Sequence, residues 1–499
     1  MDFARISATI PSEPSVKGEH IMSTSKTYPL IVIGGGSAGL TAARSAAYLG
    51  VPVALVEKER IGGDCTWAGC VPSKALLKAA KVAQTARNAA PFGVQTAHVH
   101  VDMPAVRAYV QSVIQHIYAH ETPETLQAEG IDVYLGGATF EDPHTIRVGE
   151  TLRLRGKRFI LCTGARPFIP PIEGLESVPF ETYETIFNVD RLPQRLIVIG
   201  AGPIGAELGQ AYARLGARVT LIDVAFLPTE EPEVRTVLLP RLAAEGVTMR
   251  TGLVARVARD GAEIAVWVED DPTPLRGDML LVATGRTAAL DGLGLDAAGV
   301  AVSPKGLLVD ETLRTSQPHI FAAGDCIADN PQFSHLAGAQ GFTAFRNALL
   351  PLKSKARRAA VPAVIYTEPE VARVGLTEAQ ARAQFDDVRT TTWALDRVDR
   401  AVTEHDTDGF IKAVHRANGT LLGATIVAER AGEVLTEFTA ALERGARLTA
   451  LSAPMRAYPT YSSGVAQLAG AAWRARWLAH PRWGPLIRRL ARWWAYRLR

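Results

Sequence analysis

One arrangement occurs twice in this chain and restricts the folds open to it. An apolar strand that ends at Ile33 runs into Gly34-x-Gly36-x-x-Gly39, then into an alanine-rich helix and a second apolar strand that ends at Glu57. Glycine at these three positions allows a tight turn, close approach of the backbone to a pyrophosphate, and close packing of the helix on the strand. A carboxylate at the position of Glu57 can accept hydrogen bonds from a ribose hydroxyl. The arrangement predicts a dinucleotide site, against the alternative of an ordinary tight turn.

The second copy follows another apolar strand and carries Gly200, Gly202 and Gly205, with Asp223 closing the next strand. An acidic residue at that position favours a free ribose 2′-hydroxyl, whereas a 2′-phosphate is accommodated by a nearby arginine. Arg218 lies five residues before Asp223. We predict that this second site binds NADH in preference to NADPH.

Half of the four cysteines lie close together in GGDCTWAGCVPSK, at Cys65 and Cys70. Pro72 suits a first helical turn, so Cys70 is predicted at a helix N-terminus, where partial positive charge lowers a thiol pKa. The alternatives are two buried cysteines or half of a metal site. The spacing differs from that of zinc ligands, and no second pair of cysteine or histidine residues accompanies it. We predict a redox-active pair and no metal site.

Two dinucleotide sites beside a reactive cysteine pair indicate an electron relay. A nicotinamide delivers hydride, whereas a disulfide accepts two electrons through thiolate chemistry, so a flavin is needed to convert between them. The first site is therefore predicted to hold FAD and the second NAD(P)H. The remaining cysteines, Cys162 and Cys326, are predicted to be small buried residues.

GGDCTWAGCVPSK resembles the redox-active signature of the FAD-dependent pyridine nucleotide–disulfide oxidoreductases of class I. The resemblance extends in order over about residues 28 to 465. It includes LCTGARP, LLVATGRTA and FAAGDCIADNPQF, and a segment at 361 to 380 that is similar to the opening of the family's dimerisation domain. It implies that these residues bind the two cofactors: Gly34, Gly36, Gly39, Glu57, Gly63, Lys74, Thr163, Gly164, Gly200, Gly202, Gly205, Asp223, Gly285 and Asp325.

The resemblance also implies catalytic roles. Cys70 would be the thiolate that touches the flavin ring, and Cys65 the thiol that exchanges with the substrate. Lys74 would pair with Glu207 next to flavin N5, where a lysine stabilises the negative charge of reduced flavin. Asp325 would bind the ribityl region of FAD.

Near the C-terminus the chain departs from the relatives that act on dithiols. Those relatives carry His-Pro-x-x-x-Glu, in which the histidine of one subunit moves a proton to the exchange thiol of the other. Here Tyr458 takes the histidine position and Ser463 the glutamate position. Because a tyrosine has an ordinary pKa of about 10, it is a poor proton shuttle at neutral pH. Efficient reduction of glutathione or lipoamide is not expected, although Tyr458 is still predicted to complete the site of a partner subunit.

Tyr458 and the segment LDRVDRA at 395 to 401 are similar to the mercuric reductase-like branch, which lies beside the dihydrolipoamide dehydrogenase branch. Mercuric reductases carry a further cysteine pair near the C-terminus, but this chain has no cysteine after Cys326. The favoured function is transfer of electrons from NAD(P)H through FAD and a Cys65–Cys70 disulfide to a disulfide, quinone or other small acceptor. Mercuric reduction is one alternative, and a redox-sensing flavoprotein that docks to a membrane or partner is a non-catalytic one.

The motifs also predict the domains. We expect an α/β fold with two Rossmann-like domains and a C-terminal α+β dimerisation domain, assembled as a homodimer. Residues 28–165 and 285–347 are assigned to the FAD domain, 166–284 to the NAD(P) domain and 348–468 to the dimerisation domain. Residues 1–27 are predicted to be disordered, with Met22 as an alternative start.

Residues 469–499 form a basic, tryptophan-rich tail. From residue 471 onward it holds eight arginines, no acidic residue and five of the eight tryptophans, which leaves 46 basic and 51 acidic residues elsewhere. Its last segment has apolar residues at helical spacing between arginines, a composition typical of helices that lie on anionic membranes. Packing on the enzyme's own acidic surface is the favoured interpretation, membrane contact is the second, and nucleic-acid contact is the least favoured.

The chain shows neither a secretory leader nor an apolar run of the roughly 18–20 residues that cross a bilayer. Four cysteines in so long a chain do not form a secreted disulfide framework. We therefore predict a cytoplasmic enzyme, with the basic tail as a potential contact to the inner face of the membrane.

Overall fold

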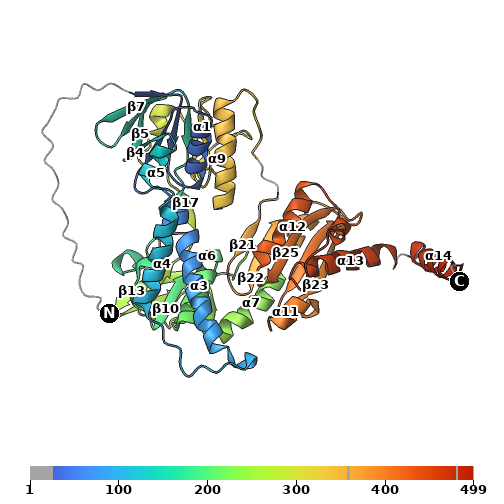
Figure 1. Cartoon of the computed structure of the whole chain (residues 1–499). Helices are drawn as coiled ribbons and strands as arrows, with labels where there is room; N and C mark the ends of the chain where they lie inside the picture. The colour runs from blue at the N-terminus through green and yellow to red at the C-terminus, as the bar shows by residue number, and fades with distance from the viewer. Residues whose placement is uncertain (1–25, 357–359, 479–480, 498–499) are drawn as a thin grey trace, which may run out of the picture.

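The computed structural model describes residues 26–356, 360–478 and 481–497. They form three units, each built around one main sheet, followed by a C-terminal helix (Figure 1). The first unit holds a five-stranded parallel sheet in the order β20-β8-β2-β3-β4. Its strands are β2 (Leu30–Ile33), β3 (Val53–Glu57), β4 (Ile131–Leu135), β8 (Phe159–Leu161) and β20 (Ile320–Ala322). The residues of β2, β8 and β20 are all buried, as expected of a parallel sheet covered on both faces.

Helices α1 (Ser37–Tyr48) and α9 (Ser334–Leu349) lie side by side on this sheet (Figure 1). A Cβ on Gly341 would lie 2.2 Å from the carbonyl oxygen of Ala38, so only glycine permits this approach. A second sheet packs into the same core, with β1 (Lys26–Tyr28), β5 (Ala138–Asp142), β6 (Thr145–Val148) and β7 (Leu152–Gly156) in the order β1-β7-β6-β5.

The second unit repeats the parallel arrangement in the order β12-β11-β10-β16. The strands are β10 (Arg195–Ile199), β11 (Arg218–Asp223), β12 (Val247–Thr251) and β16 (Met279–Val282), with helices α6 (Pro203–Leu215) and α7 (Pro232–Ala244) and the antiparallel strands β13 (Val254–Asp260), β14 (Glu263–Val268) and β15 (Leu275–Gly277). The chain enters and leaves this unit through the antiparallel pair β9 (Ala165–Pro167) and β17 (Arg286–Ala288). Helix α6 also packs against α3 (Cys70–Arg87) of the first unit.

The third unit is an antiparallel sheet in the order β21-β22-β25-β24-β23. Its strands are β21 (Ala363–Ile365), β22 (Glu370–Gly375), β23 (Val388–Ala394), β24 (Phe410–Arg416) and β25 (Leu421–Ala428), accompanied by α11 (Asp399–Thr403), α12 (Ala431–Glu443) and α13 (Ser463–Trp477). The buried Lys412 of β24 pairs with Glu231 and Glu233, which ties this sheet to the second unit. The predicted α/β class, with two dinucleotide-binding units and a C-terminal α+β unit, is confirmed.

The predicted start of order is two residues too late. Lys26 and Thr27, assigned from the sequence to a disordered terminus, belong to β1 and pair in parallel with Leu154 and Arg155 of β7. Lys26 also bonds Asp132 at 2.5 Å. A strand of three residues is too short for a periodic pattern to reveal it. Residues 1–25, including Met22, lie outside the described residues.

The remaining helices and strands, including the C-terminal helix, complete the fold. They are α2 (Gly63–Trp67), α4 (Met103–Tyr118), α5 (Pro123–Ala128), α8 (Leu295–Ala298), α10 (Glu378–Arg382), α14 (Trp483–Arg497), β18 (Val302–Ser303) and β19 (Gly306–Leu307). Within the described ranges, no helix has both the length and the apolar character that a bilayer crossing requires.

Candidate active site

The two cysteines lie in consecutive helices of the first unit. Cys65 is in α2, and Cys70 is the first residue of α3. The approach to α2 requires glycine, because Gly62 and Gly63 have φ of 104° and 57° and a Cβ on Gly63 would lie 2.8 Å from Gly36 Cα. Neither thiol is bridged; Cys65 is half-buried and Cys70 is exposed. The predicted position of Cys70 at a helix N-terminus is confirmed.

Hydrogen bonds and charge distinguish the two thiols. The pKa of Cys70 is held well below its ordinary value, first by a hydrogen bond from the Cys65 thiol. The hydroxyl of Ser334, whose oxygen lies 3.3 Å from Cys70 Sγ, and the charge of Lys74 lower it further. The hydrogen bond between the two thiols, together with burial, raises the pKa of Cys65. Because the thiolate is the nucleophilic and electron-donating form, a reduced pair at neutral pH has its negative charge on Cys70 and its proton on Cys65.

A lysine–glutamate pair lies one helical turn beyond Cys70. Lys74 Nζ is 2.9 Å from Oε2 of Glu207, a residue of α6. Glu207 Oε1 accepts a hydrogen bond from the backbone nitrogen of Tyr366 at 2.9 Å, and Lys74 Nζ lies 4.0 Å from the centre of the Tyr366 ring. All three units therefore meet at this lysine. The sequence did not single out Tyr366, since only the tertiary fold brings the residue after β21 to α3.

The sequence also did not single out Arg286, which joins the cysteine segment to the predicted flavin residue Asp325. Its Nη1 is 2.7 Å from Asp325 Oδ2, its Nη2 contacts Asp64, and its Nε is 3.1 Å from the hydroxyl of Tyr183. Arg286 is 17% exposed, and burial raises the pKa of Asp325 despite the neighbouring guanidinium. Asp64 directly precedes Cys65. The sequence signal that could have pointed to Arg286 is its position directly after Gly285 in the ATGR turn.

The first glycine loop has room for backbone only. A Cβ on Gly34 would lie 2.2 Å from the carbonyl oxygen of Cys162, and one on Gly39 would lie 1.8 Å from the carbonyl oxygen of Gly34. Cys162 is buried, as is Cys326, in agreement with the sequence. The Oγ1 atom of Thr163 is buried and has no hydrogen-bond partner among the described residues. An unpaired buried hydroxyl beside this loop fits a ligand that supplies the partner, as a bound FAD would.

The second loop repeats this backbone geometry. Gly200 has φ of 110°, and a Cβ there would lie 2.4 Å from the carbonyl oxygen of Ala283. A Cβ on Gly205 would lie 2.0 Å from the carbonyl oxygen of Gly200, whereas Gly202 and Gly285 have nothing within 4 Å of their Cβ positions. A closed turn with open space beside Gly202 allows a pyrophosphate to approach the backbone.

The two acidic residues predicted to bind ribose occupy matching positions. Glu57 Oε2 accepts a hydrogen bond from the backbone nitrogen of Gly35 at 2.6 Å, and Asp223 Oδ2 accepts one from that of Ala201 at 2.8 Å. Each carboxylate therefore lies at the carboxyl end of its parallel sheet, against its glycine loop. Ligands of open α/β sheets bind at this end of the strands.

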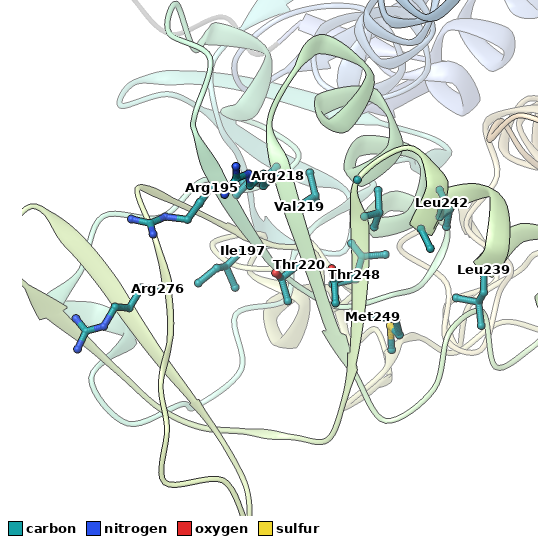
Figure 2. A pocket seen from close by; sticks show the side chains of 15 residues that line it. Arg195, Ile197, Arg218, Val219, Thr220, Leu239, Leu242, Thr248, Met249 and Arg276 are labelled. Carbon is teal, nitrogen blue, oxygen red and sulfur yellow. The ribbon is translucent and has the colours of Figure 1, made fainter. Parts of the chain in front are cut away.

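Arg218 lies at the opposite end of the second sheet. It opens the six-residue strand β11, which Asp223 ends, so the two are roughly 16 Å apart along the strand. Figure 2 shows the pocket that Arg218 lines, with a volume of about 670 Å³. One side of the pocket is lined by the arginines Arg195, Arg218 and Arg276. The other side is lined by the apolar residues Leu239, Leu242 and Met249. None of the predicted site residues lines this pocket.

The structure does not bring Tyr458 to the cysteines of its own chain. It precedes α13, which packs against β23, at the opposite edge of the third sheet from β21. Tyr458 is 74% exposed and donates a hydrogen bond to Asp399 Oδ2 at 2.7 Å, which raises the pKa of the tyrosine. Ser463 instead donates to the carbonyl oxygen of Thr460. The acidic partner of Tyr458 is therefore Asp399, although Ser463 occupies the glutamate position of the motif.

Comparison with known proteins agrees with this geometry. Residues 28–341 match the family described as pyridine nucleotide-disulphide oxidoreductase, and residues 361–469 match its dimerisation domain. The chain is 35% identical over 462 residues to a mercuric reductase of Staphylococcus aureus, covering 91% of this chain and 83% of that protein. It is 36% identical over 459 residues to a dihydrolipoyl dehydrogenase of Thermus scotoductus, covering 89% of this chain and 97% of that protein.

Solved structures show the same architecture. The HOCl-induced flavoprotein disulfide reductase RclA from Escherichia coli superposes with a TM-score of 0.81 at 28% identity, covering 89% of this chain and 99% of that one. LpdA from Mycobacterium tuberculosis gives a TM-score of 0.82 at 28% identity, with 90% and 99% covered. As the sequence motifs predict, this chain belongs to the pyridine nucleotide–disulphide oxidoreductases, a family of enzymes that use FAD and a pyridine nucleotide.

Proposed function

We propose that this enzyme takes electrons from NADH and uses them to reduce the Cys65–Cys70 disulfide, which then reduces a small oxidised acceptor. The observation that carries the proposal is the lowered pKa of Cys70 at the N-terminus of α3, beside the Lys74–Glu207 pair. Bound FAD would accept hydride from the nicotinamide and pass the two electrons to the disulfide. The acceptor class is a disulfide, a quinone or a similar small oxidant.

Each cysteine has its own part in this proposal. Two electrons cleave the disulfide and leave a thiolate on Cys70 and, after uptake of one proton, a thiol on Cys65. Exposure alone favours Cys70 as the thiol that meets the acceptor. The pKa values favour the opposite assignment, with Cys70 next to the flavin and Cys65 meeting the acceptor. Cys70 is a thiolate at neutral pH and can donate an electron pair to bound flavin, whereas Cys65 holds a proton and needs a base before it can react.

Mercuric reduction is the second candidate, since relatives named mercuric reductase are 34–37% identical to this chain. The full sequence has no cysteine after Cys326, so a mercuric ion would reach Cys65 and Cys70 without a C-terminal pair to deliver it. Two thiolates at this spacing suit a soft cation. The dimerisation domain supports a homodimer, and we propose that the dimer works in the cytoplasm.

The test is an anaerobic titration of the FAD-loaded dimer with NADH, followed in the visible spectrum. We expect the first two electrons to produce a long-wavelength absorption from a thiolate beside the flavin, before the flavin itself bleaches. Bleaching with the first equivalent, with no long-wavelength band, would show that the cysteines take no part. Turnover is then measured with disulfides, quinones and Hg(II) as separate acceptors, and a clear preference for Hg(II) would establish the second candidate.

NADH is expected to be used at least about tenfold more efficiently than NADPH, judged by kcat/KM, which corresponds to about 1.4 kcal/mol. The carboxylate of Asp223 accepts hydrogen bonds from a 2′-hydroxyl and repels a 2′-phosphate. Asp223→Ser should remove most of this preference. Arg218→Ala is the control, because Arg218 lies at the far end of β11, and a changed preference in that variant would contradict the assignment.

Tyr458→Phe and Asp399→Asn are each expected to slow reduction of the acceptor by about tenfold, the scale of losing one hydrogen bond at the reacting thiol, since Tyr458 is a poor proton shuttle at neutral pH. Reduction of the flavin by NADH should not change, because Tyr458 lies on the third unit and would act on the partner's Cys65. The hydrogen bond to Asp399 increases the electron density of the phenol oxygen. Ser463→Ala should have no effect. Equal loss in all three variants, or slower flavin reduction, would refute the role of the pair.

A further inference from the structure

Helix α14 has an apolar face whose large side chains are about half exposed to solvent. At 100° per residue, Leu486, Leu490, Trp493 and Trp494 fall within one arc of about 100°. Their side chains are 43%, 54%, 50% and 58% exposed. Monomeric soluble proteins rarely leave a contiguous row of large apolar side chains in water unless the row is an interaction site.

The opposite face of α14 is positively charged. Arg488 and Arg492 lie on it and Arg489 lies at its border, and the whole segment from residue 471 to the C-terminus contains no acidic residue. Arg488 also bonds the carbonyl oxygen of Leu478 at 3.0 Å, and Arg497 lies over the ring of Trp493 at 4.4 Å. The helix therefore combines an arginine face with an apolar face rich in tryptophan, and its last arginine, Arg497, lies within the apolar arc against Trp493.

The self-packing that the sequence favoured for this tail is seen in its first part, where Ala469 of α13 is buried and Arg476 donates a hydrogen bond to the carbonyl oxygen of Asn418. Helix α14 is much more exposed. Figure 1 shows α14 at the end of the molecule, beyond α13. Every residue of α14 is exposed except Gly484 and Ile487.

We propose that α14 docks on the surface of an anionic phospholipid bilayer. Lying in the interface, the helix would bury Leu490 and the tryptophans among the upper acyl chains while its arginines contact lipid phosphates. Binding of nucleic acid would use the arginines but leave the apolar face in water. Pairing with α14 of a second copy would bury the apolar face but bring two sets of arginines together. Of these three surfaces, only an anionic membrane both buries the apolar side chains and pairs the arginines with negative charge. This inference does not depend on which electron acceptor the enzyme uses.

The experiment is co-sedimentation of the FAD-loaded dimer with vesicles of phosphatidylglycerol and phosphatidylcholine in equal parts, compared with pure phosphatidylcholine. We expect at least tenfold tighter binding to the anionic vesicles, weakened by salt, with a blue shift of tryptophan fluorescence. Leu490→Glu with Trp494→Glu should abolish binding, and Arg488→Glu with Arg492→Glu should remove the preference for anionic lipid.

A matched control is Arg155→Glu with Arg389→Glu, which changes charge equally on the exposed surface of the first and third units. This control should bind vesicles like the wild type, and all variants should retain NADH-dependent activity in solution, because no residue of α14 belongs to the candidate site and α14 lies far from α3 of its own chain (Figure 1). Three results would overturn the proposal: no vesicle binding, equal binding to neutral vesicles, or binding that the control also loses. Binding to single-stranded RNA without vesicle binding, or a tail-dependent tetramer, would overturn it in favour of another occupant.

Discussion

Replacing Cys70 by serine is expected to lower kcat/KM for reduction of a disulfide acceptor by on the order of 10³-fold or more, the scale of losing one member of a catalytic unit. Serine cannot close the bond to Cys65 or hold a thiolate. FAD should still load and be reduced by NADH, because the glycine loops do not involve Cys70. Cys65→Ser should show a similar loss of turnover but keep the long-wavelength thiolate absorption of Cys70.

The pH dependence of that absorption provides a second readout. Because the pKa of Cys70 lies well below the ordinary thiol value of about 8.5, the thiolate should persist as the pH falls through neutrality. The absorption is lost only when the pH passes the lowered pKa of Cys70. Cys326→Ala is the control, since that thiol is buried and lies 3.4 Å from the carbonyl oxygens of Leu161 and Ala323. A wild-type band that disappears near pH 8.5, or a Cys70→Ser variant with normal turnover, would contradict the assignment.

Local backbone geometry explains why so much of the first and second units could be predicted. The glycine loops depend on turns within a few residues, so Gly34, Gly39, Gly200 and Gly205 can be read directly from the chain. The position of Cys70 at the start of α3 is equally local, since Pro72 marks the first turn. These features need no knowledge of distant contacts.

Residues that act through long-range contacts were harder to find. Arg286 reaches Asp64 across 222 positions, and Tyr366 reaches Glu207 across 159. Asp399 meets Tyr458 only because α11 and the segment before α13 pack at one edge of the third sheet. The pairing of Lys74 with Glu207 is equally remote, and only the resemblance to a family supplied it. Sequence spacing cannot express such contacts, because they depend on how the units pack.

Arg286→Met is expected to destabilise the protein by about 3–5 kcal/mol, the usual cost of removing one partner from a buried ion pair. The arginine is 17% exposed and lies between the carboxylates of Asp64 and Asp325. Without it, the buried carboxylate of Asp325 and the partly exposed carboxylate of Asp64 lose their shared counter-charge. FAD affinity should fall as well, because Arg286 holds Asp325 in position. Thermal unfolding and release of flavin fluorescence measure the two effects.

The matched control is Arg166→Met, which removes an arginine from an exposed pair with Asp291, where both side chains are more than half exposed. It should cost less than about 1 kcal/mol, as surface pairs do. The loss in Arg286→Met should be smaller when Asp64→Asn is added, because one of the two uncompensated charges is then absent.

The pH profile gives the sign of the electrostatic effect. Burial already raises the pKa of Asp325, and losing Arg286 raises it further. A carboxyl whose pKa is higher in the folded state than in the unfolded state destabilises the fold as the pH rises through that pKa. The loss of folding stability in Arg286→Met should therefore be largest near neutral pH. It should become smaller in acid, because the carboxyl of Asp325 then takes up its proton. A deficit that does not vary with pH would mean that lost packing of the arginine stem, and not unbalanced charge, accounts for the effect.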